Sequence, residues 1–288
     1  MVVENPYANS LDGLKIDDPV KSFFDYCKER EAVRIKRESG EPFPWSEDSI
    51  FQKGRFLNVF REDDKVSKSI IQFAEPAKQD LPLLIQSLFF GRWCNKQTTI
   101  DNLTVNELNN PEALKNKLTN LEQWENYTAY PVEDSHWGEK LYSRIDAATY
   151  KFYEKKEEIT ELIINSNQDV IAATNSINRQ FKMNNDFPIF MALIDIAWFR
   201  EDIIPITTNV PTGIGAEPYL DRLQEFLNLS NHQEVGLKMI DLQKEYWPEA
   251  KRDFYPIDIE YQSCECRKYF SYVNGTKKFE GKNLFQFD

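Results

Sequence analysis

Residues 187–200 read Phe-Pro-Ile-Phe-Met-Ala-Leu-Ile-Asp-Ile-Ala-Trp-Phe-Arg and are apolar on nearly every side of a helix. A helix without a polar face has to be surrounded by other elements. We therefore expect this segment to form a central buried helix. One acid, Asp195, interrupts the run, and an unpaired carboxylate is costly in an apolar core. Asp195 is expected to pair with a cation, either Arg200 or one near Arg55 and Arg92, or else to act as a catalytic acid or base.

Helical spacing continues on both sides of this segment. Apolar residues recur at helical spacing over residues 19–39, which Gly40 ends, and Asp80 is expected to cap a second buried helix. Strand-like alternation is scarce. The sequence therefore predicts a mainly α fold with one helical catalytic domain over 19–288 and a flexible arm over 1–18. Further helices are expected within 81–93, 101–125, 151–181, 217–229 and 233–246, with an aromatic, irregular stretch over 126–142.

The composition limits the classes of protein. The 288 residues are 41% hydrophobic, which is enough for a substantial core. The net charge of −12 argues against a general nucleic-acid binder, because duplex binding depends on neutralising phosphates with Lys and Arg. Locally the balance differs: residues 28–68 contain 10 Lys and Arg against 9 Asp and Glu, and residues 264–282 contain 5 against 2. A basic face is therefore compatible with the sequence.

Neither a signal peptide nor an apolar run of about 18 residues is present. The sequence thus predicts a cytoplasmic protein without a membrane partner, whose four cysteines are free thiols. Cys264 and Cys266 form a Cys-x-Cys pair, but a structural zinc site needs four ligands, and His136 and His232 lie in unrelated contexts. We therefore expect no metal site. The absence of a Gly-x-x-x-x-Gly-Lys-Ser/Thr motif excludes a P-loop kinase.

Three arginines are expected to share one face of the first long helix. Arg30, Arg34 and Arg37 are spaced i, i+4 and i+7. Like charges on one face repel each other unless an anion neutralises them, and the guanidinium group matches phosphate oxygens in pairs. The arrangement predicts a phosphate or pyrophosphate ligand. The alternative is a solvated face on which the arginines pair with Glu38 and Glu41.

A second group of polar and aromatic residues follows the first helix. Trp45 could stack on a base, and Arg55 and Arg61 could hold phosphates. Asn58 could read a base edge, and Asp63 could orient an arginine, bind a metal or accept a proton. The alternative is a helix cap followed by surface ion pairs.

The segment from Val210 to Pro218 contains Gly213-Ile-Gly215, which resembles the hairpin of helix-hairpin-helix DNA-binding modules. Backbone N–H groups at such a turn face a DNA phosphate. An ordinary helix–helix turn is the alternative. No Lys closely follows Gly215, so a lyase mechanism that proceeds through a Schiff base lacks its nucleophile.

A last polar group lies near the C-terminal end of the sequence. Glu265 and Lys268 are spaced i and i+3, so on a helix they could pair or face a ligand together.

Taken together, these blocks resemble the alpha-glutamyl/putrescinyl thymine pyrophosphorylase family, which is related to the helical domain of 5-hydroxymethyluracil DNA kinases. The blocks follow the family's order. Residues 97–180 contain no such block, and Ser46 stands where Thr is usual. The matching residues are Glu29-Arg30, Ile35-x-Arg37, Gly40 with Pro44-Trp45-Ser46-x-Asp48, Arg55-Phe56-x-Asn58-Val59-x-Arg61-x-Asp63, Phe90-x-Arg92, Phe187 to Asp195, Gly213-x-Gly215 and Cys264-Glu265-x-x-Lys268-Tyr269.

The resemblance implies an enzyme of bacteriophage DNA hypermodification. In that family's pathway a kinase first makes 5-pyrophosphoryloxymethyl-deoxyuridine in DNA. A family member then displaces pyrophosphate with an amine, such as an amino acid or a polyamine. The implied partners are modified DNA, an amine donor and a DNA kinase, and the implied fold is shared with helix-hairpin-helix DNA glycosylases. No cofactor is required, although Mg²⁺ could assist with pyrophosphate.

The residue chemistry fits this reaction. Cations would stabilise the leaving pyrophosphate, a carboxylate would deprotonate the amine, and Trp45 or Phe56 would stack on the modified base. The expected catalytic residues are Asp63, Asp195, Glu265 and Lys268. The expected substrate-binding residues are Arg30, Arg34, Arg37, Trp45, Asp48, Arg55, Phe56, Asn58, Arg61, Arg92 and Tyr269. Gly213 and Gly215 would contact the DNA backbone.

Three other functions are compatible with the sequence. One is a glycosylase-like hydrolase that acts on a modified base. Another is a non-catalytic DNA-binding partner of a 5-hydroxymethyluracil DNA kinase. The third is an acidic all-α protein without a nucleic-acid role, which the net charge of −12 favours.

Overall fold

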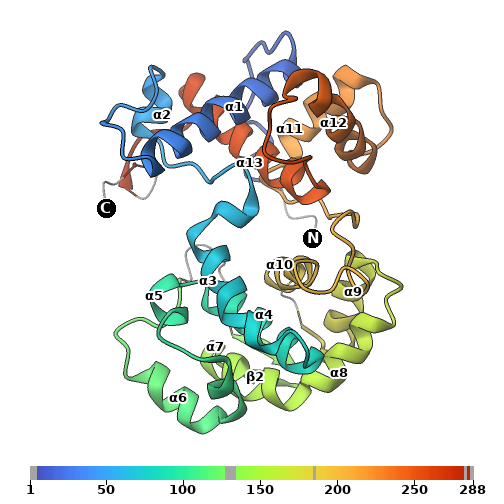
Figure 1. Ribbon diagram of the computed structural model, residues 1–288. Helices are drawn as coiled ribbons and strands as arrows, with labels where there is room; N and C mark the ends of the chain where they lie inside the picture. The colour runs from blue at the N-terminus through green and yellow to red at the C-terminus, as the bar shows by residue number, and fades with distance from the viewer. Residues whose placement is uncertain (1–4, 127–133, 184–185, 282–283, 286–288) are drawn as a thin grey trace. The chain divides into compact units, whose positions relative to one another are not determined.

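The computed structural model describes residues 5–126, 134–183, 186–281 and 284–285, and it is mainly α-helical (Figure 1). This confirms the predicted fold class. The chain packs into two compact units. Unit 1 comprises residues 1–64 and 210–288, and unit 2 comprises residues 65–209.

The predicted single domain over 19–288 and the flexible arm over 1–18 concern folding and motion, so they stay predictions. The described part of the arm does contact unit 1. Asn5 donates a hydrogen bond to the carbonyl of Ile214 at 2.9 Å, and Leu11 is buried.

Unit 1 is built on its two longest helices, α1 (Pro19–Glu38) and α13 (Pro256–Val273), which pack against each other. The side chain of Asp18 accepts a hydrogen bond from the Lys21 N–H and caps the start of α1. Gly40, whose φ is +78°, follows the end of α1, as predicted. The other elements of unit 1 are α2 (Ser49–Lys53), the short 3₁₀ helix η1 (Arg61–Asp63), α11 (Glu217–Leu227) and α12 (His232–Tyr246).

Aromatic side chains fill the core of unit 1. Phe23 and Phe24 of α1 are fully buried and both contact Phe254, with ring centroids 6.2 Å apart in each pair. Tyr219 of α11 contacts Phe23 and donates its hydroxyl hydrogen bond to the carbonyl of Pro19. These contacts fix α11 and the start of α13 against α1.

Unit 2 surrounds α4 (Leu81–Cys94) and α10 (Asp186–Ile196), which pack closely on each other. Residues 189–196 of α10 are all buried, so the predicted central buried helix is confirmed. The helix stops at Ile196 rather than at Arg200, because the chain turns there through hydrogen bonds between residues three apart, such as Trp198 N–H to Asp195 O. The other helices of unit 2 are α3 (Lys65–Ala74), η2 (Glu75–Ala77), α5 (Gln97–Ile100), η3 (Val105–Asn109), α6 (Pro111–Thr119), α7 (Arg144–Asp146), the π-helix η4 (Ala147–Lys151), α8 (Phe152–Ile164) and α9 (Val170–Phe181).

Two features of unit 2 differ from the sequence prediction. Residues 134–142, expected to be irregular, include the antiparallel hairpin of β1 (Ser135–Trp137) and β2 (Lys140–Tyr142), which turns at Gly138 with φ +68°. Residues 127–133 of that stretch lie outside the described residues. The continuous helical pattern over 151–181 is broken at Asn167 and Gln168, which both have a left-handed backbone. None of the described helices is long and apolar enough to cross a membrane.

Candidate functional site

Arg30 holds the segment that follows α2. Its side chain is buried, and it donates hydrogen bonds to the carbonyls of Leu57 (2.9 Å) and Phe56 (3.2 Å) and to the Asn58 side chain. Asn58 in turn donates to the Asp63 carbonyl at 2.8 Å. Burial lowers the pKa of Arg30. Arg30 and Asn58 therefore fix the backbone of residues 56–58 more than they face solvent.

Helix α13 meets the same segment from the other side. The buried Glu265 carboxylate accepts a hydrogen bond from the Leu57 N–H at 2.9 Å and lies 3.2 Å from the Lys268 ammonium. Lys268 also lies over the Phe56 ring, 5.1 Å from its centroid. Phe56 is itself buried among aromatic rings, so its face is not open to a base. The predicted Glu265–Lys268 pair does form.

Three further residues of the resembling blocks, Tyr269, Asp48 and Trp45, lie in unit 1. Tyr269 donates a hydrogen bond to the Asp48 carboxylate at 2.5 Å, and the other Asp48 oxygen caps α2. Trp45 is half-buried and contacts the exposed ring of Phe43 edge to face. The N-terminal and C-terminal blocks thus meet in unit 1. We call Arg30, Asn58, Glu265, Lys268 and the backbone of residues 56–58 the α1–α13 cluster.

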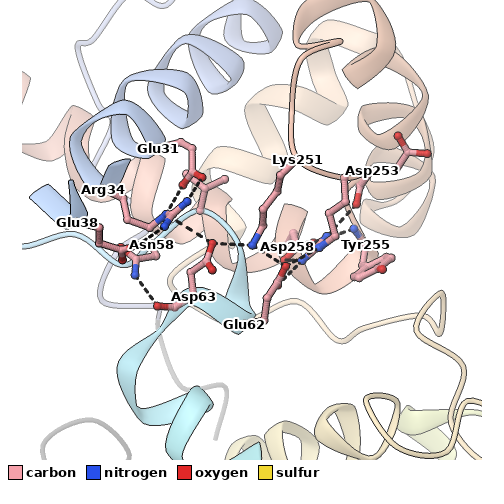
Figure 2. Close-up of polar contacts among 12 residues, drawn as sticks. Glu31, Arg34, Glu38, Asn58, Glu62, Asp63, Lys251, Asp253, Tyr255 and Asp258 are labelled. Carbon is pink, nitrogen blue, oxygen red and sulfur yellow. Dashed lines mark hydrogen bonds and ion pairs between the residues drawn. The ribbon is translucent and has the colours of Figure 1, made fainter. Parts of the chain in front are cut away.

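Arg34 is paired with carboxylates, of which Glu38 was predicted as the alternative to a phosphate ligand, whereas Glu31 and Asp63 were not. Its guanidinium contacts Glu31 at 2.5 Å and Glu38 at 2.6 Å, and its Nε lies 3.5 Å from Asp63 (Figure 2). These carboxylates raise the pKa of Arg34, and the hydrogen bond that Arg34 donates to Glu31 is the largest cause. Arg34 is therefore engaged with protein carboxylates and is not available to phosphate without breaking them.

Asp63 belongs to a longer chain of ion pairs in unit 1. The Lys251 ammonium lies 2.7 Å from Asp63 and 2.9 Å from Glu62, and Arg252 joins Glu62 to Asp258 (Figure 2). Burial opposes the ionisation of Glu62, but hydrogen bonds from Arg252 and Lys251 outweigh it and lower the Glu62 pKa to about 2. The charge of Asp63 is therefore compensated by cations, and we do not propose Asp63 as the base.

Arg92 and Asp195 pair with each other in unit 2. Both are fully buried, and the guanidinium donates to the two carboxylate oxygens at 2.5 and 2.9 Å. Arg92 also donates to Ser67 at 3.1 Å. The structural role that the sequence offered for Asp195 accounts for this geometry. We therefore do not carry either residue forward into the proposed site.

The Gly213-x-Gly215 turn packs directly on α13. The Gly213 N–H donates to the buried Glu260 carboxylate at 2.9 Å, and Arg267 donates to the Gly215 carbonyl at 2.8 Å. A Cβ atom on Gly215 would lie 2.6 Å from the Cys264 sulfur, so the helix approaches too closely for a side chain. The Gly213 N–H is thus already engaged, whereas the N–H groups of Ile214 and Gly215 donate no hydrogen bond within the described residues.

Glu260 is the most perturbed acid beside this turn. Burial raises its pKa to about 7, although the hydrogen bond from Gly213 and the charge of Arg61 act in the opposite direction. Arg61 is buried and therefore lies inside unit 1 rather than on a phosphate-binding surface.

Two arginines in the blocks that match the family have no polar partner among the described residues. Arg37 is half-buried and Arg55 is exposed, and neither guanidinium forms a hydrogen bond or ion pair with a described residue. Lys36 and Lys53 nearby in sequence form no ion pair with the described chain either. In a protein of net charge −12, unpaired cations flanking the α1–α13 cluster are the groups best suited to meet an anion.

The described residues contain no group of three or more His, Cys, Asp and Glu arranged to hold a metal ion. The four cysteines are free thiols, and burial raises the pKa of Cys264 to about 11.

Sequence reasoning missed several residues of this region. Tyr261 of α13 donates to the Asn58 carbonyl at 2.6 Å, and its spacing of four from Glu265 was a usable helical signal. Tyr26 precedes Arg30 by four residues on α1 and was equally accessible to that reasoning. Lys251 and Arg252 lie in an irregular segment, where no periodicity relates them to Glu62.

The fold and this cluster define a class of protein. It is mainly helical, and its first and last long helices bring arginine, glutamate and lysine side chains together. The model of one family, described as 5-hmdU DNA kinase, helical domain, matches residues 18–278. The chain belongs to this family, which connects it to thymine hypermodification of DNA. No curated protein and no solved structure matches it.

Proposed function

We propose that this protein is a transferase of DNA thymine hypermodification. It displaces pyrophosphate from 5-pyrophosphoryloxymethyl-deoxyuridine in DNA with an amine. The nitrogen of the amine forms a bond to the 5-methylene carbon, the carbon–oxygen bond breaks, and pyrophosphate leaves with the electron pair. The nitrogen then releases one proton to a base. No oxidant or reductant is needed.

One observation carries the proposal: the unpaired cations Arg37 and Arg55 flank a cluster that holds a carboxylate and an ammonium group. A leaving pyrophosphate develops negative charge, which fixed cations stabilise. Lys268 adds a third cation with a partly exposed side chain. The family's connection to modified thymine supplies the kind of substrate.

Glu265 is the carboxylate that we assign as the base. Among the acids expected from the sequence, Asp63 and Asp195 are held by cations in ion pairs of 2.7 and 2.5 Å, respectively. Glu265 lies 3.2 Å from Lys268, a longer and partly exposed contact. A base has to lie within hydrogen-bond reach of the proton it accepts, and Glu265 keeps this option if Lys268 moves aside.

The DNA backbone is assigned to the turn at residues 213–215. The N–H groups of Ile214 and Gly215 are free of hydrogen bonds to described residues, and Ile214 is 60% exposed. Such N–H groups bind phosphate oxygens. Trp45 and the exposed Phe43 are the aromatic residues that we assign to the modified base, because the buried Phe56 has no open face.

The test is incubation of the purified protein with DNA that carries 5-pyrophosphoryloxymethyluracil and a pool of amino acids and polyamines, with either Mg²⁺ or a chelator present. Pyrophosphate release and the masses of the digested nucleosides are measured. A new adduct with equimolar pyrophosphate supports the transferase. Abasic sites or free base would instead indicate a glycosylase-like hydrolase.

A non-catalytic DNA-binding partner of a kinase is the second candidate. It is favoured because several acids, including Asp63 and Asp195, are engaged in ion pairs and are not free to act as a base. Unchanged DNA without pyrophosphate release, combined with salt-dependent binding, would support that candidate over the transferase.

A further inference from the structure

The carbonyl groups of the Gly213-x-Gly215 turn are all engaged within unit 1. The Gly213 carbonyl accepts hydrogen bonds from the N–H groups of Ala216 (2.9 Å) and Glu217 (3.1 Å). Side chains from distant parts of the chain hold the other two carbonyls. The N–H groups of Ile214 and Gly215 remain without a hydrogen bond to a described residue. The side chains that hold the carbonyls therefore determine where these N–H groups point.

Asn5, in the arm that precedes α1, holds the carbonyl of Ile214. Its side-chain amide donates to that carbonyl at 2.9 Å and also to the Glu217 carboxylate, and its oxygen accepts from the Tyr7 N–H at 2.8 Å. The Ile214 carbonyl and the Gly215 N–H belong to one peptide group. This peptide is trans, so the two groups point in opposite directions. Asn5 therefore directs the Gly215 N–H away from the arm.

Arg267 and Tyr7 hold the next carbonyl along the turn. The Arg267 side chain is buried, and its Nε donates to the Gly215 carbonyl at 2.8 Å. The Tyr7 ring lies against the guanidinium group, with 4.2 Å between Arg267 Cζ and the ring centroid. A cation is attracted to the face of an aromatic ring. Tyr7 thus favours the guanidinium position from which Arg267 reaches Gly215.

The arm is attached to unit 1 a few residues after Tyr7. Leu11 is buried, and the Ser10 carbonyl accepts hydrogen bonds from Asn274 at 2.9 Å and from Thr276 at 3.3 Å. Asn274 and Thr276 follow the end of α13, the helix that also carries Arg267. The turn is therefore held jointly by the arm and by α13.

The glycines of the turn make such restraint necessary. Glycine lacks a Cβ atom and adopts both halves of φ space readily, so a peptide group beside it rotates at little cost. Rotation of the peptide between Ile214 and Gly215 would direct its carbonyl oxygen, rather than its N–H, toward a bound phosphate. The two oxygens would then repel each other. The hydrogen bond from Asn5 to the Ile214 carbonyl opposes this rotation.

We propose that Asn5 and Tyr7 are positioning residues for a DNA phosphate at this turn. They fix the peptide groups so that the N–H groups of Ile214 and Gly215 stay available to a phosphate oxygen. Their own side chains do not contact the phosphate. Groups that are already oriented before binding lose less freedom when the ligand arrives, so the arm increases DNA affinity.

The positioning role rests on the proposed function, which assigns the DNA backbone to this turn. Binding of unmodified DNA can be measured apart from the chemistry. DNA binding without pyrophosphate release from modified DNA would contradict only the transferase. Pyrophosphate release by the parent, with parental DNA affinity in variants of Asn5 and Tyr7, would contradict only the positioning role.

The experiment measures the affinity of the full chain for a fluorescein-labelled, unmodified DNA duplex by anisotropy at several KCl concentrations. Asn5→Ala and Tyr7→Ala should each weaken binding about tenfold, a typical loss for one hydrogen bond to a charged group. The dependence of affinity on salt should not change, because neither substitution removes a cation. The controls are Tyr7→Phe, which keeps the ring against Arg267, and Asn9→Ala, which alters an exposed residue of the same arm. Both controls should bind as the parent does.

A second readout separates positioning from a general loosening of unit 1. The amide NMR signals of Ile214 and Gly215 should shift when DNA is added to the parent or to Tyr7→Phe, and much less with Asn5→Ala. The melting temperature of each arm variant should match that of the parent, since Asn5 contacts the turn at the surface and Tyr7 is 38% exposed. Absence of DNA binding by the parent, or DNA affinity in Asn5→Ala equal to or above that of the parent, would overturn the proposal.

Discussion

Arg30 and Arg92 are both buried arginines, and different partners hold them. Arg92 forms two hydrogen bonds with one carboxylate, that of Asp195. Arg30 donates to main-chain carbonyls and to Asn58, and keeps one nitrogen unpaired. The first arrangement closes a pair inside a core. The second fixes the backbone of residues 56–58, which is why Arg30 belongs to the α1–α13 cluster and Arg92 does not.

Removing one member of the Arg92–Asp195 pair should strongly destabilise the fold. Arg92→Met leaves a buried carboxylate without its cation, so we expect the free energy of unfolding in urea to fall by about 3–5 kcal/mol. The double variant Arg92→Met with Asp195→Leu is the control, because it removes both charges and should recover much of the loss. A single variant as stable as the parent would contradict the structural assignment of this pair.

Glu260 should make stability depend on pH. Its pKa is raised from 4.5 to about 7, so the folded chain binds this proton more tightly than the unfolded chain. The favourable contribution is present below pH 4.5 and is lost as the pH rises through about 7. Glu260→Gln keeps an acceptor for the Gly213 N–H without the charge. At roughly 1.4 kcal/mol per pKa unit, it should be up to about 3 kcal/mol more stable than the parent at pH 8.

The difference between the two proteins should shrink as the pH falls and vanish well below pH 4.5, where the glutamate is protonated in both states. Urea titrations at several pH values measure it. A constant difference between parent and variant across this range would show that Glu260 does not titrate as assigned.

Helix α13 is the element on which the site depends. One face of it carries Glu260 and Cys264 against the Gly213-x-Gly215 turn, and another carries Glu265 and Lys268 toward residues 56–58. The turn and the cluster are therefore fixed by a single rigid element.

Close packing of α13 on the turn should make Gly215 intolerant of a side chain. A Cβ atom there would meet the Cys264 sulfur at 2.6 Å, so Gly215→Ala should cost about 1–3 kcal/mol of unfolding free energy. Gly236→Ala in α12 is the matched control, because nothing lies within 4 Å of its Cβ position. That substitution should stabilise the helix by about 0.5–1 kcal/mol. Equal effects of the two substitutions in urea unfolding would argue against the close approach.

Most of the longer helices could be predicted because they carry a local signal, whereas α13 was not predicted as a helix. Each signal lies within a few residues of the helix that it marks. Examples are the caps at Asp18 and Asp80, the glycine after α1 and the apolar run of α10. The pairing of Arg92 with Asp195 was among the expected options, since a buried acid needs a cation. Only the family resemblance suggested that residues 56–58 contact α13, because both segments contain residues that match the family.

The remaining contacts depend on tertiary packing that no local pattern encodes. Lys251 lies in an irregular segment 188 residues from Asp63 in sequence, yet it neutralises that acid. Glu260 is buried against the turn at Gly213, 47 residues away in sequence, and no local pattern predicts that contact. The break between α8 and α9 depends on left-handed backbone at Asn167 and Gln168, neither of which is a glycine.

The chain as a whole is divided unevenly between its two compact units. Unit 2 is one continuous segment, residues 65–209, with its own core around α4 and α10. Unit 1 is formed by both ends of the chain, so its α1–α13 cluster exists only when residues 1–64 and 210–288 come together. The candidate site described here lies entirely within unit 1.

A continuous segment with its own core should fold without the rest of the chain. We expect a fragment of residues 65–209 to be helical by circular dichroism and to unfold cooperatively in urea. Residues 1–64 alone should be largely unstructured, because α1 would lack the faces of α11 and α13. A fragment 65–209 without cooperative unfolding would favour the single folding domain that the sequence predicted.

The central claim is that unpaired cations beside the α1–α13 cluster stabilise a leaving pyrophosphate. The most direct measurement is the single-turnover rate of pyrophosphate release from DNA carrying 5-pyrophosphoryloxymethyluracil. Parent protein is compared with the double variant Arg37→Gln and Arg55→Gln. The control double variant, Arg179→Gln and Arg222→Gln, removes two exposed arginines elsewhere and therefore changes the net charge equally.

We predict that the parent and the control release pyrophosphate at similar rates and that the Arg37 and Arg55 variant is slower by about 100-fold or more. No pyrophosphate release by the parent, or an unchanged rate in the Arg37 and Arg55 variant, would contradict the claim.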